Sequence, residues 1–296
     1  MKPLILITND DGYESKGIRT LAGVAQEFGD VIVMAPERNS SAKSLSLTTD
    51  RPLRVKDVSS QWAVAIGQWP VGSGQWAVSG YGDGSRPTDH RTSDTDHSQQ
   101  NIKVYACDGL PVDCLKLAYE HFCPRIPDLV LSGINHGSNS SINVLYSGTI
   151  GAVLEATMLG VQAVGFSLLN HSPEADLSAC IPFVRYIVGR VLEKGLPDNV
   201  GLNVNIPRLP LEEIKGIRVC RQARARWMDS FEPRVDPRGR PYWWLTGKFE
   251  CPEPPQESDE QALAEGYVSV VPIRPDLTCR EAINPISQLL TTDHHE

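Results

Sequence analysis

Long apolar segments and an excess of positive charge are both missing from this sequence of 296 residues. No segment approaches the roughly 20 apolar residues that a membrane-spanning helix needs. The apolar run at residues 4–7 is followed at once by Asn9-Asp10-Asp11, so we interpret it as a buried strand and not as a signal peptide. Lys and Arg total 28 against 36 Asp and Glu, a net charge of −8, which indicates no surface for nucleic acid. We expect neither membrane nor nucleic-acid partners.

The cysteines form neither a disulfide framework nor a zinc-binding pattern. There are seven, an odd number, and no two are spaced as Cys-x-x-Cys. A reducing, cytoplasmic location is the simplest interpretation. The glycine fingerprint of dinucleotide-binding oxidoreductases is missing too, because residues 12–17 read Gly-Tyr-Glu-Ser-Lys-Gly where Gly-x-Gly-x-x-Gly is required. A Rossmann-type oxidoreductase is thereby disfavoured.

The chain does contain a regular alternation of short apolar strands and amphipathic helices. Residues 4–8 and 31–35 are typical of buried strands, and residues 18–28 between them have apolar side chains at helical spacing. The alternation continues through strands at 128–132, 163–168 and 201–206 and helices at 149–159 and 180–193. The sequence therefore predicts the α/β class, with a doubly wound, mostly parallel, Rossmann-like sheet.

Residues 68–101 depart from this alternation. They are rich in Gly, Ser, Asp, Thr and His, and Gln-Trp and Thr-Asp-His motifs recur within and around them. Such a composition buries too little apolar surface to offset the entropy of ordering, so we interpret the segment as a flexible surface insertion. His90 and His97 stand beside Asp residues, but we expect a solvated loop there and not a metal site.

The last third of the chain has a different character again. Residues 242–245 (Tyr-Trp-Trp-Leu) and 264–272 are prone to form strands. We interpret residues 1–215 as one α/β domain that contains the insertion, and residues 216–296 as a β-rich extension. Aromatic strands on an extension more often pack against a second subunit than form a core of their own, so we expect a homodimer or homotetramer.

Polar residues follow directly on three of the predicted strands. Asn9-Asp10-Asp11-Gly12 follows the first, at the place where open parallel sheets bind ligands. Two adjacent carboxylates repel each other unless a cation joins them, and oxygen ligands suit Mg²⁺ or Mn²⁺. The alternative is an Asx turn that caps the following helix.

The two other polar segments strengthen the first interpretation. Residues 35–41 and 133–139 lie on the same predicted edge of the sheet, and Ser147 and Thr149 directly precede a helix. Backbone N–H groups at a helix start, with these hydroxyls, are suited to bind a phosphate. Simple capping by Ser147 or Thr149 is the alternative.

Together these segments resemble the SurE family of survival-protein nucleotidases. The resemblance covers residues 4–50, 105–170 and 201–275, and it rests on Asn9–Gly12, Ala35-Pro36-Glu37-Arg38-Asn39 with Ser41, the segment 108–114, Ser132-Gly133-Ile134-Asn135 and Tyr146-Ser147-Gly148-Thr149. It implies a single divalent cation per subunit, Mg²⁺ or Mn²⁺, held by Asp10, Asp11, Ser41 and Asn135. It also implies phosphate or substrate contacts from Asn9, Asn139, Ser147, Gly148 and Thr149.

This chain departs from the usual SurE pattern at three places. Ala42 stands where the family commonly has Gly, Leu110 stands where it has Thr, and Ser140-Ser141-Ile142 replaces a segment that often contains Leu-Gly and an acidic residue. Loss of a Gly that permits positive φ would move the loop at residue 42. The change at Leu110 removes a hydroxyl.

The resemblance implies hydrolysis of nucleoside 5′-monophosphates, and of 3′-monophosphates as a possible extension, with Asp10 and Asp11 as the catalytic residues. Either carboxylate could orient or deprotonate water, or attack phosphorus itself. His136 is a further candidate acid. Two alternatives stay open: a general acid phosphatase or exopolyphosphatase, and a nucleotide-binding regulatory module without turnover.

Overall fold

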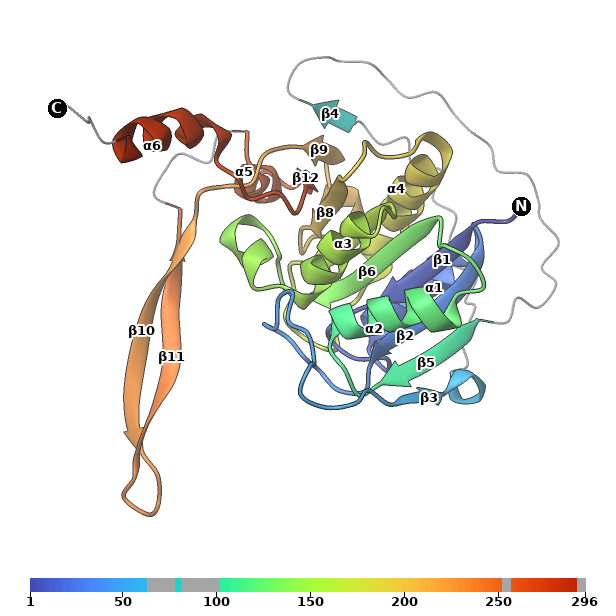
Figure 1. Cartoon of the computed structure of the whole chain (residues 1–296), viewed down its shortest axis with the longest axis horizontal. Coiled ribbons are helices and arrows are strands. Elements are labelled where there is room, and N and C mark those ends of the chain that lie inside the picture. Colours follow the sequence, from blue (N-terminus) through green and yellow to red (C-terminus); the bar gives the residue numbers. More distant parts are fainter. Residues whose placement is uncertain (63–77, 81–101, 252–256, 292–296) are drawn as a thin grey trace.

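The alternation of strands and helices folds into one large sheet (Figure 1). The structure is a computed structural model that describes residues 1–62, 78–80, 102–251 and 257–291. Within these residues the sheet has ten strands in the order β3-β5-β2-β1-β6-β7-β8-β12-β9-β4. In chain order they are β1 (Leu4–Thr8), β2 (Asp30–Pro36), β3 (Val55–Asp57), β4 (Val78–Gly80), β5 (Lys103–Cys107), β6 (Leu129–His136), β7 (Ala163–Leu168), β8 (Gly201–Ile206), β9 (Ile217–Val219) and β12 (Val268–Ile273).

Most strand pairs are parallel, which confirms the predicted α/β, doubly wound architecture. Within the ten-stranded sheet the exceptions are β3 with β5 and β12 with β8, which run antiparallel. The helices are α1 (Lys16–Ala25), α2 (Pro111–Leu117), α3 (Gly148–Met158), α4 (Ile181–Lys194), α5 (Asp259–Ala264) and α6 (Ile283–Leu290). No helix in the described part of the chain has the length and apolarity needed to cross a bilayer.

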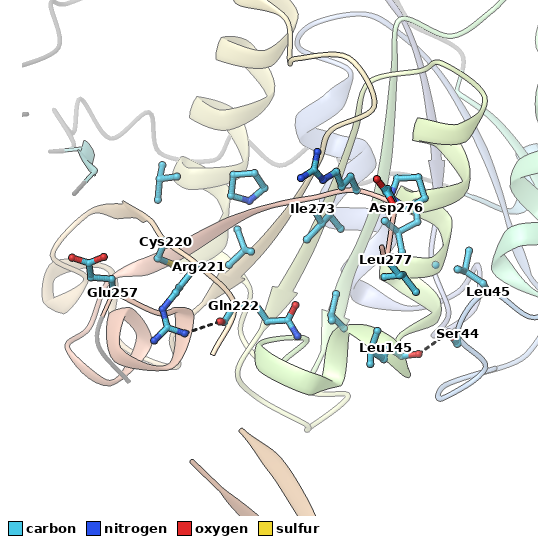
Figure 2. A pocket seen from close by; sticks show the side chains of 18 residues that line it. Ser44, Leu45, Leu145, Cys220, Arg221, Gln222, Glu257, Ile273, Asp276 and Leu277 are labelled. Atoms are coloured by element: carbon cyan, nitrogen blue, oxygen red, sulfur yellow. Dashed lines mark hydrogen bonds between the residues drawn. The ribbon is translucent and has the colours of Figure 1, made fainter. Parts of the chain in front are cut away.

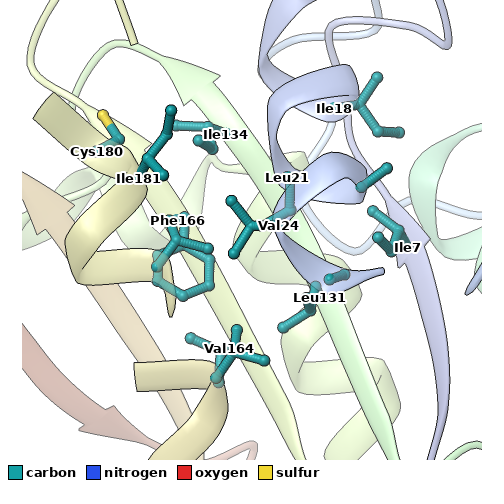
Figure 3. Close-up of a cluster of buried hydrophobic side chains, with 14 of the residues drawn as sticks. Ile7, Ile18, Leu21, Val24, Leu131, Ile134, Val164, Phe166, Cys180 and Ile181 are labelled. Carbon is teal, nitrogen blue, oxygen red and sulfur yellow. The ribbon is translucent and has the colours of Figure 1, made fainter. Parts of the chain in front are cut away.

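The apolar run at residues 4–7 forms most of strand β1, which is buried on both faces of the sheet. Ile5 and Ile7 point into a core with α1 and α4 on one face of the sheet. Leu4 and Leu6 point to the opposite face, where α2 and α3 pack. Because both faces are covered, the strand is apolar throughout instead of alternating. Figure 3 shows the first of these cores, where Ile7, Leu21 and Phe166 converge between the sheet and the two helices.

The C-terminal third contributes both to the sheet and to a projecting arm. β9 and β12 pair with each other, and β12 pairs with β8, so the chain returns to the sheet beyond the boundary predicted at residue 215. Strands β10 (Arg226–Val235) and β11 (Pro241–Glu250) pair only with each other among the described residues. We call these two strands and their turn the arm; Figure 1 shows it extending away from the sheet.

Two details of the sequence interpretation need correction. The strand predicted at 264–272 begins at Val268, because α5 occupies the preceding residues and Gly266, at φ 83°, makes the turn between them. Residues 78–80, inside the predicted insertion, form β4, which pairs with β9. Backbone pairing needs no particular side chains, so the composition gave no sign of it. The rest of that insertion, His90 and His97 included, lies outside the described residues.

Candidate active site

Asp10 lies at the carboxyl end of β1 and is held by the start of α3. Only 3% of its surface is exposed, and its Oδ1 accepts a hydrogen bond of 2.7 Å from the Thr149 hydroxyl. A Cβ atom at Gly148 would lie 2.9 Å from Asp10 Cβ, so the helix start packs directly on this carboxylate. Burial, and to a smaller extent Asp11, raises the pKa of Asp10 to about 6, although the bond from Thr149 lowers it.

Asp11 is held by two other segments at the same edge of the sheet. Its Oδ2 accepts the N–H of His136 at 3.3 Å, and its Oδ1 accepts the Asn39 amide at 3.3 Å. Burial raises the pKa of Asp11, and the His136 N–H lowers it. The loops after β1 and β2 and the end of β6 therefore meet at this carboxylate, as parallel strands require.

Asn9 and Gly12 shape the turn that carries the two carboxylates. Asn9 is fully buried, and its side-chain amide donates to the Gly12 carbonyl (3.0 Å) and to the Ser15 hydroxyl (2.8 Å). Gly12 takes φ 98°, a conformation that a residue with a Cβ adopts only at a cost. These contacts brace the turn, and the contact of Asn9 with phosphate stays a prediction.

Ser41 is linked to Asp11 through the side chain of Asn39. Asn39 Oδ1 accepts both the N–H (2.9 Å) and the hydroxyl (2.7 Å) of Ser41, while its amide nitrogen reaches Asp11. The neighbouring Ala42 has φ 60°, so this loop keeps the left-handed conformation even though Ala replaces the expected Gly. Such a conformation costs an Ala about 1 kcal/mol relative to Gly.

Asn135 lies on β6 one residue before His136. It is 8% exposed, and its amide nitrogen donates to the Gly137 carbonyl at 2.9 Å. The pairing of β6 with β7 shifts register between Ser132 and Asn135, and such irregularities redirect side chains near active sites. Burial, followed by Lys16, lowers the pKa of His136, whose role as an acid stays a prediction.

In the structure, side chains that we expect to contact phosphate form hydrogen bonds within the protein. Ser147 is the N-cap of α3, because its hydroxyl accepts the N–H of Ile150 at 3.1 Å, which is the capping role that we weighed as the alternative. Thr149 uses its hydroxyl on Asp10. Asn139 donates its side-chain amide to Ser167 Oγ at 2.8 Å. Their contacts with phosphate stay predictions.

The described residues are suited to bind a divalent cation. Neither Asp10 nor Asp11 forms an ion pair with a Lys, Arg or His side chain in the part of the chain that the structure describes. Asp10 is buried and Asp11 is half-buried, and a cation between these two carboxylates with raised pKa values stabilises them best. No cluster of three or more His, Cys, Asp and Glu is found among these residues, so the remaining ligands would be neutral oxygens such as those of Ser41 and Asn135.

The residues that hold the predicted ones in place were not apparent from the sequence. Asn39 was recognised only as part of a motif, and its bridge from Asp11 to Ser41 depends on the loop conformation. Asn203 and Asn205 on β8 hold the backbone of Asn139: its carbonyl accepts the Asn203 amide (2.9 Å) and its N–H donates to Asn205 Oδ1 (2.8 Å). Two buried Asn residues spaced by one in an apolar strand were the available signal.

A cavity of about 770 Å³ has a lining that contains none of the predicted site residues (Figure 2). Leu45, Leu145, Ile273 and Leu277 are among the side chains that line it. Its lining is mainly apolar, which does not suit a phosphate.

Comparisons with known proteins agree with the geometry. The family described as "Survival protein SurE" matches residues 5–229. The 5'-nucleotidase SurE of Christiangramia forsetii is 44% identical over 292 residues, which cover 99% of this chain and 98% of that protein. The 5'-nucleotidase SurE of Flavobacterium psychrophilum is 41% identical over 286 residues, 97% of either chain. The crystal structure of the SurE protein from Aquifex aeolicus superposes with a TM-score of 0.73 at 32% identity, covering 97% of this chain and 99% of that one. The chain therefore belongs to the SurE family.

Proposed function

We propose that this chain is a 5′-nucleotidase that hydrolyses the phosphomonoester of nucleoside 5′-monophosphates with the help of one divalent cation. The observation that carries the proposal is the carboxylate pair at the carboxyl end of β1, where Asp10 is buried against the start of α3 and Asp11 beside it is half-buried. The names of the relatives at 41–44% identity support the same activity.

Asp10, Asp11, Ser41 and Asn135 would hold the cation, with Mg²⁺ or Mn²⁺ favoured by the all-oxygen donors. When bound, such a cation offsets the negative charge of the phosphoryl oxygens and activates water. Metal dependence also fits the raised pKa of both carboxylates, which indicates that their negative charges lack compensation in the protein alone.

The protein's own groups have distinct tasks in this proposal. Thr149 fixes Asp10 in one orientation, so that its free oxygen can accept a proton from the attacking water or attack phosphorus itself. The first turn of α3 favours the negative charge that develops on the phosphoryl group. Asn39 fixes Asp11 in the same way from the loop after β2.

Phosphate release tests this proposal directly. Purified protein should release phosphate from nucleoside 5′-monophosphates with Mg²⁺ or Mn²⁺ and lose that activity after EDTA treatment and dialysis. The same assay with 3′-monophosphates, p-nitrophenyl phosphate and polyphosphate separates the 5′-nucleotidase from the alternatives. Tight nucleotide binding without any release of phosphate would contradict the proposal and favour the regulatory module.

We further infer that a second copy of the chain covers the arm. The register of β10 and β11 places Trp227, Phe231, Trp243 and Leu245 on one face of the hairpin, and these side chains are between 45% and 63% exposed. A two-stranded hairpin is at best marginally stable in water without a surface to pack against. An apolar face of this kind is typical of an interface, which supports the predicted homodimer or homotetramer.

Introducing a Lys on one face of the arm or on the other tests whether the apolar face lies in a subunit interface. Leu245→Lys should shift the oligomer towards monomer in light scattering after gel filtration, because a Lys side chain on the apolar face must be desolvated. Thr246→Lys, the next residue on the opposite, more polar face, is the matched control and should leave the mass unchanged. An unchanged mass for Leu245→Lys would contradict the inference.

The cytoplasmic location stays a prediction.

A further inference from the structure

The loop between β6 and α3 carries Asn139 and Ser147, two of the proposed phosphate contacts, and it is anchored on two sides. Strand β8 holds its beginning through the side chains of Asn203 and Asn205 described above. The second anchor lies in residues 221–225, which lead into the arm, and in α5. This second anchor has no place in the proposed chemistry.

Asp259 is the centre of the second anchor. It is the first residue of α5 and is fully buried. Its Oδ2 accepts the N–H of Ser141 at 2.7 Å, and its Oδ1 accepts the N–H groups of Ala223 and Glu260, both at 2.9 Å. Burial raises the pKa of Asp259, and these N–H groups lower it. One carboxylate therefore joins the active-site loop, the root of the arm and α5.

Ser141 completes the same junction. It is fully buried at φ 53°, and its hydroxyl donates to the Ala223 carbonyl (3.0 Å) and accepts the N–H of Ala225 (3.1 Å). Ala225 directly precedes β10. A further link runs from Trp227 on the arm, whose indole N–H donates to Asn143 Oδ1 at 2.8 Å. The loop is thus attached once to the root of the arm and once to the arm itself.

We propose that Asp259 and Ser141 are positioning residues, which fix the phosphate-binding loop to the root of the arm. The inference rests on the proposed function, since it assigns the loop a role in binding phosphate. Both side chains are fully buried, so neither is placed to touch a substrate. Asp10 and Asp11 are held by contacts of their own, with Thr149, Asn39 and His136. Loss of the junction should therefore weaken the binding of phosphate and leave the binding of the cation intact.

Two variants test this separation. Asp259→Asn keeps the shape of the side chain but replaces one acceptor oxygen by an NH₂ group, which cannot accept an N–H from Ser141 or Ala223. Ser141→Ala keeps the bond to Asp259 and removes the bonds of the hydroxyl. In both we expect the KM for a nucleoside 5′-monophosphate and the Kd for inorganic phosphate to rise about tenfold. We expect the Kd for Mn²⁺ to stay that of the wild type.

Ser258→Ala is the matched control, because it removes the side-chain cap of the same helix α5 and leaves the bonds of the Asp259 carboxylate in place. It should keep the KM and the phosphate Kd of the wild type. If Asp259→Asn and Ser141→Ala both do so too, the inference is wrong. Equal losses of phosphate and Mn²⁺ affinity would also overturn it, because they would indicate a general loss of structure.

The proposed function is tested independently of the junction. If the wild type releases no phosphate from any nucleoside monophosphate, the nucleotidase proposal is wrong. The junction is then judged on the calorimetric Kd for inorganic phosphate, which needs no turnover.

Discussion

Asp10→Asn is expected to reduce kcat for a nucleoside 5′-monophosphate at least about a thousandfold, since it removes a charged group that binds the cation and that acts as base or nucleophile. The variant should still fold. Its remaining Oδ1 can accept the bond from the Thr149 hydroxyl, so the packing of β1 against α3 is retained. The measurement is phosphate release at saturating substrate and Mg²⁺, with circular dichroism to confirm the fold.

The control for this variant is Asp57→Asn, an isosteric change at an exposed carboxylate on the edge strand β3. Its kcat should match that of the wild type. Activity of Asp10→Asn within a few-fold of the wild type would remove Asp10 from the catalytic residues. Asp11 accepts hydrogen bonds from Asn39 and His136, whereas Asp10 accepts one from Thr149. The same assay on Asp11→Asn therefore measures the contribution of the second carboxylate separately.

Removal of the cation is expected to make stability depend on pH through Asp10. Burial raises the pKa of this carboxyl from 3.8 to about 6 in the folded protein. The folded state therefore binds its proton more tightly than the unfolded state does. The contribution of Asp10 to stability is fully present below about pH 4 and is lost as the pH rises through about 6. A shift of this size corresponds to roughly 3 kcal/mol.

Urea unfolding in EDTA at pH 4 and at pH 7.5 measures this effect. From pH 4 to pH 7.5, the free energy of unfolding of the metal-free wild type should decrease by more than that of Asp10→Asn, which has no charge to desolvate. Saturating Mg²⁺ or Mn²⁺ should restore the wild type at pH 7.5, because a cation that binds only the folded state stabilises it. An identical pH dependence in the two proteins would show that Asp10 is not desolvated in solution.

The sequence alone was sufficient to predict the sheet and the edge at which its polar residues gather. Apolar runs such as residues 4–7 are continuous because both faces of a parallel strand are buried, and that pattern is visible without coordinates. Polar residues after successive strands of such a sheet meet at one edge, so the convergence of Asp10, Asp11 and Asn135 follows from the topology. The SurE motifs then indicated the chemistry.

The contacts that give each side chain its task could be found only in the tertiary structure. The hydroxyl of Thr149 could equally serve a phosphate, a helix cap or a neighbouring carboxylate, and its bond to Asp10 depends on how α3 packs against β1. Asp259 lies 118 positions from Ser141 along the chain, and no local pattern links the two. Local spacing determines strands, helices and caps, because those interactions involve residues a few positions apart. Hydrogen bonds between distant segments depend on the complete packing, and here they join the loop between β6 and α3 to α5 and to the root of the arm.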